Sequence, residues 1–266
     1  MTLSTQLYGW SQVYAQRGLD FTQHYDEILT AVAEAGYDSA EGSLDLTQPD
    51  FVPAWAERLR AHGLRPASLY AGGDFHVPDL AETVVAGLLA VAPALSASGF
   101  STLCVNPNPI GRPKTDAELA IQAAQLQVLG AGLRAHGVAL GLHNHTPEMI
   151  NAGREFHGNL RNTDPQDVGL FMDVHWCYRG GADPCVIWDE YRDRIVGLHV
   201  RQSVDGIWVE DLRDGEIDYR PMLTELAARD FTGPIVVEIA YEDGTLQTRD
   251  VAEAHRISLE YLRGLL

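Results

Sequence analysis

Eight short apolar runs recur along this chain, and a longer amphipathic stretch follows each of them. We predict strands at residues 5–10, 37–42, 66–72, 101–107, 139–145, 168–174, 196–201 and 234–240. Strands that alternate with helices are typical of parallel sheets with right-handed crossovers. Because eight such units can close on themselves, the pattern predicts an α/β fold, a single (β/α)8 TIM-barrel domain over residues 1–266.

A doubly wound open sheet is the structural alternative. Such a sheet often carries a G-x-G-x-x-G motif after its first strand, and this chain has none there. The segments RLRAHGLRPASL (58–69) and AGLRAHGVALGL (131–142) also resemble each other. Both combine a helix end, a glycine and a strand, as expected when one structural unit repeats. The sequence therefore favours the barrel.

Glycines follow the ends of most of the predicted helices. A glycine just past a helix end adopts the left-handed conformation at little cost, and we expect this at Gly36, Gly63, Gly99, Gly137 and Gly233. The longest irregular stretches, residues 106–115, 145–158 and 202–219, follow strands. In a barrel these stretches belong to the catalytic face.

Charge and cysteine usage restrict the partners and the compartment. Nineteen Lys and Arg face 37 Asp and Glu, a net charge of −18, which disfavours nucleic acid and anionic membrane surfaces as partners. Cys104, Cys177 and Cys185 lack C-x-x-C spacing and indicate free thiols in a reducing compartment. No basic segment followed by an apolar one opens the chain, and no apolar run approaches the roughly 20 residues of a membrane helix. We therefore expect a cytoplasmic protein.

Acidic and imidazole side chains stand at the ends of four consecutive predicted strands. They are Glu148, Asp173, His199 and Glu238. Since the ends of parallel barrel strands share one rim, these side chains can converge on a single metal ion. A buried carboxylate without a partner costs several kcal/mol or is neutralised. A metal would supply that partner, although a salt bridge from Arg201 would also serve Asp173.

Three carboxylates and one imidazole form a harder ligand set than a Cys/His zinc site. The set suits one divalent ion, with Mn²⁺ expected first and Mg²⁺, Co²⁺ or Zn²⁺ as alternatives. A divalent ion that holds a substrate carbonyl and its neighbouring hydroxyl polarises the adjacent C–H bond. Glu148 and Glu238, reaching the site from opposite sides of the barrel, could then move a proton.

Further polar and aromatic residues are candidates for contacting a substrate. His143 and His145 point to the same side of the predicted strand, and His143 could equally pack in the barrel wall. His175 follows Asp173 by two residues and would face the same way in a strand. The candidate substrate-binding residues are His175, His145, Arg201, Glu41, His76 and Trp176. Glu41 could also act as a base next to the site, and we infer no phosphate for Arg201 because no glycine-rich phosphate loop is visible.

Five segments carry a resemblance to a known group of proteins. They are HNHTPE (143–148), MDVHWCYRGGADP (172–184), LHVRQ (198–202), GEIDY (215–219) and VVEIAYE (236–242). The chain resembles the sugar isomerase/epimerase branch of the xylose isomerase-like barrel superfamily, with ketose 3-epimerases, hydroxypyruvate isomerases and inosose dehydratases. The resemblance implies that Glu148, Asp173, His199 and Glu238 bind the metal, that Glu148 and Glu238 are the acid/base pair, and that the protein forms a homo-oligomer.

The chain departs from that group at two places. The epimerases often carry a histidine three residues after the aspartate, whereas this chain has Trp176 there and His175 before it. Many relatives have Lys-Asp where this chain has Arg201 and Gln202. The substrate pocket is therefore expected to differ. The endonuclease IV-like nucleases of the superfamily need a fuller histidine set, and the charge of −18 argues further against them.

These observations predict a metal-dependent isomerase or epimerase of carbohydrate metabolism. It would act on a small sugar or keto-polyol through an enediolate. One alternative is an inosose dehydratase-like lyase, in which the same base removes a proton and a β-hydroxyl then leaves as water. Another is a barrel that binds a ligand without catalysis, which the complete set of four metal-binding candidates argues against.

Overall fold

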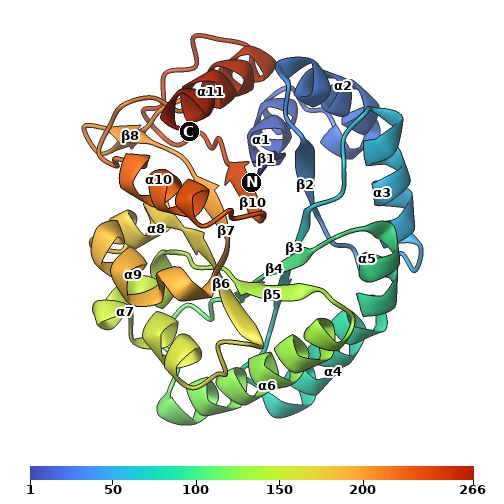
Figure 1. Ribbon diagram of the computed structural model, residues 1–266, viewed down its shortest axis with the longest axis vertical. Coiled ribbons are helices and arrows are strands. Elements are labelled where there is room, and N and C mark those ends of the chain that lie inside the picture. The colour runs from blue at the N-terminus through green and yellow to red at the C-terminus, as the bar shows by residue number, and fades with distance from the viewer. The chain divides into compact units, whose positions relative to one another are not determined.

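The computed structural model describes residues 1–266 and contains eight parallel strands in a closed barrel, the predicted (β/α)8 fold (Figure 1). The hydrogen-bonded order is β1-β10-β7-β6-β5-β4-β3-β2. The barrel strands are β1 (Thr2–Gln6), β2 (Ser39–Ser43), β3 (Ser68–Gly73), β4 (Thr102–Pro107), β5 (Ala139–Leu142), β6 (Val168–Asp173), β7 (Ile195–Val200) and β10 (Pro234–Val237). A short antiparallel hairpin of β8 (Ser203–Val204) and β9 (Ile207–Trp208) follows β7.

Helices connect the strands and begin where the local sequence provides caps. Thr115 and Glu118 form a capping box at the start of α6, which satisfies two backbone donors that the first turn leaves open. The α-helices are α1 (Tyr8–Gln16), α2 (Tyr25–Ala35), α3 (Phe51–Ala61), α4 (Pro78–Ala90), α5 (Ala92–Ser98), α6 (Asp116–Ala135), α7 (Thr146–Arg161), α8 (Val174–Arg179), α9 (Pro184–Tyr191), α10 (Arg220–Ala228) and α11 (Val251–Leu265). Two 3-10 helices are η1 (Phe21–His24) and η2 (Arg192–Arg194).

The chain divides into two compact units. The first unit comprises Met1–Gly42, Ala56–Ala67 and His199–Leu266, and the second comprises Ser43–Trp55 and Ser68–Leu198. In the first unit β1 pairs with both β2 and β10, and α2 packs against α11 (Figure 1). In the second unit β3, β4, β5 and β6 pair in sequence, and α4 packs against α6. The assignment of the chain to a single domain stays a prediction.

The first strand lies earlier than predicted. β1 ends at Gln6, and α1 begins at Tyr8 within the range that we assigned to the strand. Trp10, Val13 and Tyr14 are buried in α1. Their spacing places them on one helical face, so burial in a helix decides the conformation of this aromatic segment.

Four of the five expected glycines end helices in the left-handed region, with φ between 74° and 95° at Gly36, Gly63, Gly99 and Gly137. The expectation for Gly233 was wrong. After α10 it is Asp230 that adopts a positive φ, of 52°, and aspartate is one of the few other residues that tolerates this conformation.

The expectation that no run is apolar enough to cross a membrane was also wrong. Residues 78–98 reach a mean hydropathy of 1.8 and could span a membrane by length and composition alone. In the structure they form two helices, α4 and α5, which meet at Val91. Val85, Leu88 and Leu95 are buried, and 28% of the apolar window is buried in the structure.

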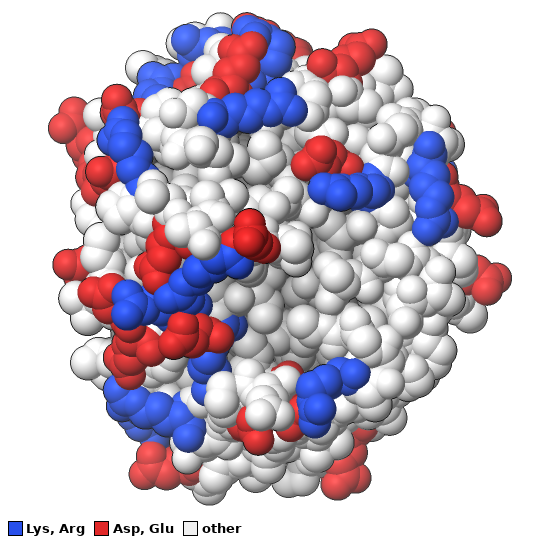
Figure 2. Space-filling model, in the orientation of Figure 1, with Lys and Arg blue, Asp and Glu red and all other residues white.

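Basic side chains on the surface are accompanied by acidic ones. On the face drawn in Figure 2, blue and red residues stand next to one another. Ion pairs of this kind include Arg220 with Asp214 and Arg256 with Glu253, at 3.0 and 2.7 Å. The arginines in these pairs are compensated locally, and the face in view carries no continuous basic area.

Candidate active site and metal-binding residues

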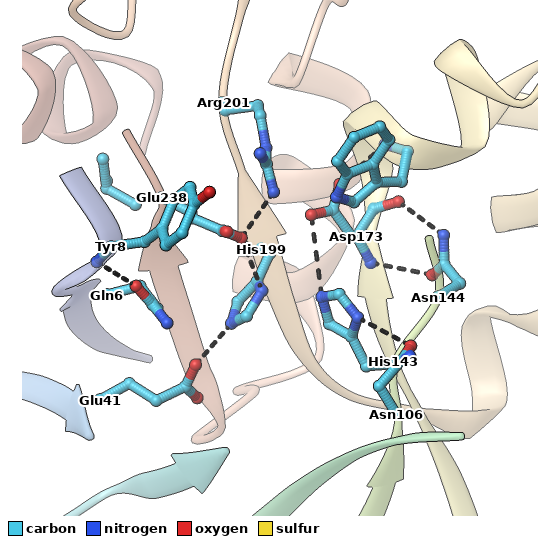
Figure 3. A network of polar contacts seen from close by, with 12 residues as sticks. Gln6, Tyr8, Glu41, Asn106, His143, Asn144, Asp173, His199, Arg201 and Glu238 are labelled. Carbon is cyan, nitrogen blue, oxygen red and sulfur yellow. Dashed lines mark hydrogen bonds and ion pairs between the residues drawn. The ribbon is translucent and has the colours of Figure 1, made fainter. Parts of the chain in front are cut away.

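In the first unit a buried histidine lies between two carboxylates (Figure 3). His199 stands on β7, Glu41 on β2, and Glu238 directly after β10. The Nε2 atom of His199 lies 2.7 Å from Glu41 Oε2, and its Nδ1 atom lies 3.0 Å from Glu238 Oε2. Burial lowers the pKa of His199, but the charges and hydrogen bonds of Glu41 and Glu238 outweigh burial and raise that pKa to about 10. Each ring nitrogen of His199 therefore faces a carboxylate oxygen.

Arg201 completes this group of charges. Its Nη2 atom lies 2.6 Å from Glu238 Oε2, so the arginine forms an ion pair with Glu238. The guanidinium lies 4.8 Å from the ring centroid of Trp208 in the β8–β9 hairpin, a cation–π contact. The Trp208 backbone N–H donates to Glu242, and the Tyr219 hydroxyl donates to the Arg201 carbonyl. The hairpin therefore fixes the arginine from one side.

In the second unit Asn144 holds Asp173 at the end of β6 (Figure 3). The Asn144 side chain accepts from the Asp173 N–H at 3.0 Å and donates to the Asp173 carbonyl at 3.1 Å. Asp173 Oδ1 caps α8 by accepting from the Trp176 N–H at 2.8 Å. Asp173 Oδ2 lies 3.8 Å from His143 Nε2, and His143 Nδ1 lies 3.4 Å from Asn106 Oδ1. One buried imidazole and one buried carboxylate thus form a second pair.

Glu148 occupies the first turn of α7, so the expectation of an irregular loop over residues 145–158 was wrong. Its Oε2 atom accepts from the His145 N–H at 2.7 Å, while Oε1 is buried without a hydrogen-bond partner. Burial raises the pKa of Glu148 to about 7, against the lowering effect of the His145 hydrogen bond. Pro147 and Glu148 after a polar residue are a helix-start signal that the strand-end argument overlooked.

The backbone directly after Glu148 is strained. Ile150 is extended, and Asn151, Ala152 and Gly153 adopt left-handed conformations in succession, with φ of 53°, 56° and 68°. Residues other than glycine pay about 1–2 kcal/mol each for this conformation. Helix α7 therefore consists of two helical pieces, and Glu148 belongs to the short first piece.

The remaining candidates lie in different settings. His175 is fully buried in α8 and not in a strand, so the argument from strand alternation was wrong for it. His145 is half-buried, with its ring centroid 4.6 Å from that of His143 and 5.5 Å from that of Trp176. His76 is buried, and its Nδ1 atom has no hydrogen-bond partner.

Sequence reasoning gave too little weight to His143 and missed Asn144 as a support for Asp173. His143 is the first residue after β5, just as Glu238 is the first residue after β10. The position directly past the last strand residue was the signal that could have singled out His143. A second buried pair, Lys114 Nζ with Glu155 Oε1 at 2.5 Å, was also missed.

A family model described as xylose isomerase-like TIM barrel matches residues 29–265. The chain belongs to this family. The resemblance to the xylose isomerase-like barrels that was seen in the sequence is thereby confirmed.

The names of several proteins similar to this chain refer to reactions of sugars or of an inosose. An inosose dehydratase of Geobacillus kaustophilus is 27% identical over 250 residues, which cover 81% of this chain and 80% of that protein. A D-allulose 3-epimerase from Methylomonas sp. superposes with a TM-score of 0.77 at 20% identity, covering 100% of this chain and 98% of the other. A sugar phosphate isomerase/epimerase from Parabacteroides distasonis gives a TM-score of 0.74 at 18% identity, covering 98% and 93%. At these identities the structural likeness shows the fold.

The distances between the imidazole nitrogen and the carboxylate oxygen in the two buried pairs can be compared with the distances between two ligands of one divalent ion. Two ligand atoms that each lie about 2.1 Å from an ion are about 3 Å apart at a right angle and about 4.2 Å apart when opposite. The His199–Glu238 separation is 3.0 Å and the His143–Asp173 separation is 3.8 Å. Both fall in that range. Buried imidazole nitrogens and carboxylate oxygens also suit transition-metal ions chemically. Each pair therefore fits a divalent cation.

Proposed function

We propose that this protein is a divalent-metal-dependent enzyme that isomerises or epimerises a small sugar or keto-polyol. The observation that supports this most is the pair of buried imidazole–carboxylate groups, His143 with Asp173 and His199 with Glu238. Charged groups are rarely buried in a fold without a partner or a task. In a parallel barrel the residues that follow the strands face one rim, where barrel enzymes carry out their chemistry.

We propose that these four residues share one divalent cation, with Mn²⁺ as the first candidate. From the sequence we expected Glu148 as a metal ligand, and this proposal has His143 as the ligand instead of Glu148. Its Oε2 atom already caps α7, whereas the His143 ring lies beside Asp173. When bound, the cation would polarise a substrate carbonyl and its neighbouring hydroxyl, which weakens the adjacent C–H bond.

Glu148 and Glu238 remain the proposed acid and base. Glu148, with a pKa near 7, exists in both protonation states around neutral pH, as efficient proton transfer requires. Its Oε1 atom has no hydrogen-bond partner in the protein and is available to a substrate proton. Glu238 is oriented by Arg201 and His199. Around them, His145, Arg201, Trp176, His76 and His175 are the proposed substrate-binding residues.

A second candidate function is dehydration of a keto-polyol. It is favoured by the Geobacillus relative, an inosose dehydratase that aligns over most of both chains. The first step is the same removal of a proton next to a carbonyl. The reactions differ afterwards, because in the lyase a β-hydroxyl leaves as water, while in the epimerase the proton returns to carbon.

Proton NMR in D₂O distinguishes the two outcomes. The metal-stripped protein is incubated with Mn²⁺ and a panel of keto-sugars and an inosose, and Mn²⁺ is removed before the spectra are recorded. Deuterium incorporation next to the carbonyl without loss of water supports isomerisation or epimerisation. A dehydrated diketone or enone supports the lyase. Neither exchange nor dehydration of any compound, with the metal bound, would contradict the proposal.

The matched controls are Glu148→Gln and an exposed Glu57→Gln on α3. The first removes a proposed base and is expected to lower exchange by at least about 10²-fold. The second makes the same chemical change away from the site and should leave exchange as in the wild type.

A further inference from the structure

Glu41 does not lie where a substrate-binding residue would be expected. Its side chain is fully enclosed, and its Oε2 atom lies 2.7 Å from His199 Nε2. The residue stands within β2, where it is in register with Gln6 of β1. Its position is therefore set by the strand ladder and not by a loop, and the carboxylate points at the imidazole (Figure 3).

This contact decides which nitrogen of His199 can serve a metal. A metal-binding imidazole uses one unprotonated nitrogen and keeps its proton on the other. The Glu41 carboxylate can accept a hydrogen bond from a proton on Nε2, the nitrogen that it faces at 2.7 Å, whereas Glu238, which faces Nδ1, is itself a proposed ligand of the metal. The unprotonated nitrogen is then Nδ1, which is the atom that lies 3.0 Å from Glu238 Oε2.

We propose that Glu41 is a positioning residue that holds His199 as the Nε2–H tautomer and so leaves Nδ1, the nitrogen that faces Glu238, to bind a metal. This role rests on the proposed function, because it takes His199 as a ligand. The earlier predictions for Glu41, that it binds a sugar hydroxyl or acts as a base next to the site, stay predictions. Carboxylates that support metal-bound histidines in this way typically contribute about 10–100-fold to metal affinity.

The test measures binding of Mn²⁺ alone, by electron paramagnetic resonance titration of the metal-stripped full chain. The wild type is expected to bind one Mn²⁺, and Glu41→Ala to bind it about 10–100-fold more weakly. Glu57→Ala, on the surface of α3, removes the same charge and should bind Mn²⁺ like the wild type. This control matters because a protein of net charge −18 attracts cations non-specifically.

A second readout reports the tautomer directly. In the diamagnetic Zn²⁺-loaded protein, ¹H–¹⁵N spectra of the histidine rings should show a slowly exchanging Nε2–H for His199, assigned by its absence in His199→Gln. Glu41→Ala should lose this protection. Formate is small enough to enter the space left by the side chain and should restore part of the Mn²⁺ affinity, whereas chloride at the same ionic strength should not. A purely structural role would give neither result.

The outcomes separate this role from the proposed function. Equal Mn²⁺ affinity in the wild type and Glu41→Ala would overturn the role of Glu41 and leave the metal site standing. Absence of Mn²⁺ binding by the wild type would overturn the metal site and this role together. If Glu41→Ala does not fold, Glu41→Gln carries the test, because it keeps an acceptor oxygen but loses the charge. A several-fold loss of affinity is then expected, and no loss would contradict the proposal.

Discussion

His255 makes the stability of this protein depend on pH in a way that the structure allows us to calculate. The ring is fully buried in α11 and stacks on Trp10 with a centroid distance of 3.7 Å. Nδ1 lies 2.7 Å from the Val251 carbonyl, which can only accept, so the proton of the neutral ring is on Nδ1. Nε2 is buried without a partner. Protonation would place a charge and an unsatisfied donor in the core.

Burial lowers the pKa of His255 from its ordinary value of 6.5 to about 3, although the Val251 hydrogen bond acts in the opposite direction. The folded state therefore resists a proton that the unfolded chain accepts below pH 6.5. The stability contributed by the neutral ring is complete above pH 6.5 and is lost as the pH falls toward 3. One pKa unit corresponds to about 1.36 kcal/mol, so at pH 5 the loss is about 2 kcal/mol.

The assay is urea unfolding at pH 8 and pH 5, with EDTA present throughout, for the wild type and His255→Phe. The phenyl ring can keep the stack on Trp10 but does not titrate. The free energy of unfolding of His255→Phe will differ from that of the wild type at both pH values. The quantity to compare is the change in this free energy between pH 8 and pH 5 in each protein. The wild type is expected to lose about 2 kcal/mol more than His255→Phe over this interval. His136→Asn, at an exposed helix end, controls for the loss of one histidine.

Parallel pH dependences in the wild type and His255→Phe, within about 0.5 kcal/mol, would refute the reasoning. They would mean that the ring accepts a proton in the folded state, for example because the end of α11 opens. Ring ¹⁵N shifts at pH 5 provide an independent check, since a neutral His255 is expected there.

Further predictions concern packing, charge, metal and assembly. Lys114→Met should cost about 3–5 kcal/mol in urea unfolding because it leaves the Glu155 carboxylate buried without its cation, and Lys114→Met/Glu155→Leu should recover part of the loss; a cost below 1 kcal/mol would contradict this. Gly130→Ala should lower the free energy of unfolding by about 1–3 kcal/mol, because the new Cβ would lie 2.4 Å from a backbone carbonyl oxygen. Gly158→Ala has open space around its Cβ and should raise the free energy of unfolding by up to about 1 kcal/mol. Equal effects of the two substitutions would show that the backbone near Gly130 moves to accept the Cβ. Mn²⁺ at 100 times its dissociation constant should stabilise the protein by about 2.7 kcal/mol in calorimetry, reversibly with EDTA, and Asp173→Ala should abolish the effect. We expect light scattering to give a multiple of 29.2 kDa, and 29.2 kDa itself would rule out the homo-oligomer.

The strand positions could be predicted because both faces of a barrel strand are buried. Such strands read as continuous apolar runs, and runs such as VGLFMD (168–173) carry no competing helical pattern. The first run was misplaced because its aromatic residues suit a strand and a helix equally. Only the burial of Trp10, Val13 and Tyr14 against the rest of the fold makes that segment helical.

Within the candidate site, the residues visible in the sequence are those whose charge conflicts with an apolar neighbourhood. Asp173 and Glu238 each follow a buried run, and such a charge needs a partner wherever the chain folds. The choice between His143 and Glu148 could not be made in the same way. It depends on β5 ending at Leu142 and on α7 starting at Thr146.

The sequence by itself determined the barrel, the family and the chemical types of residue that follow the strands, because hydrophobic periodicity and isolated charges are local properties. The tertiary structure decided which of those residues meet. Glu41 and His199 are 158 positions apart and share a hydrogen bond only because β2, β1, β10 and β7 are neighbours in the barrel. Arg201, directly after β7, likewise pairs with Glu238, directly after the neighbouring strand β10. Such contacts depend on the register between strands that are far apart in the sequence. Side-chain packing selects this register, and a local sequence pattern does not predict it.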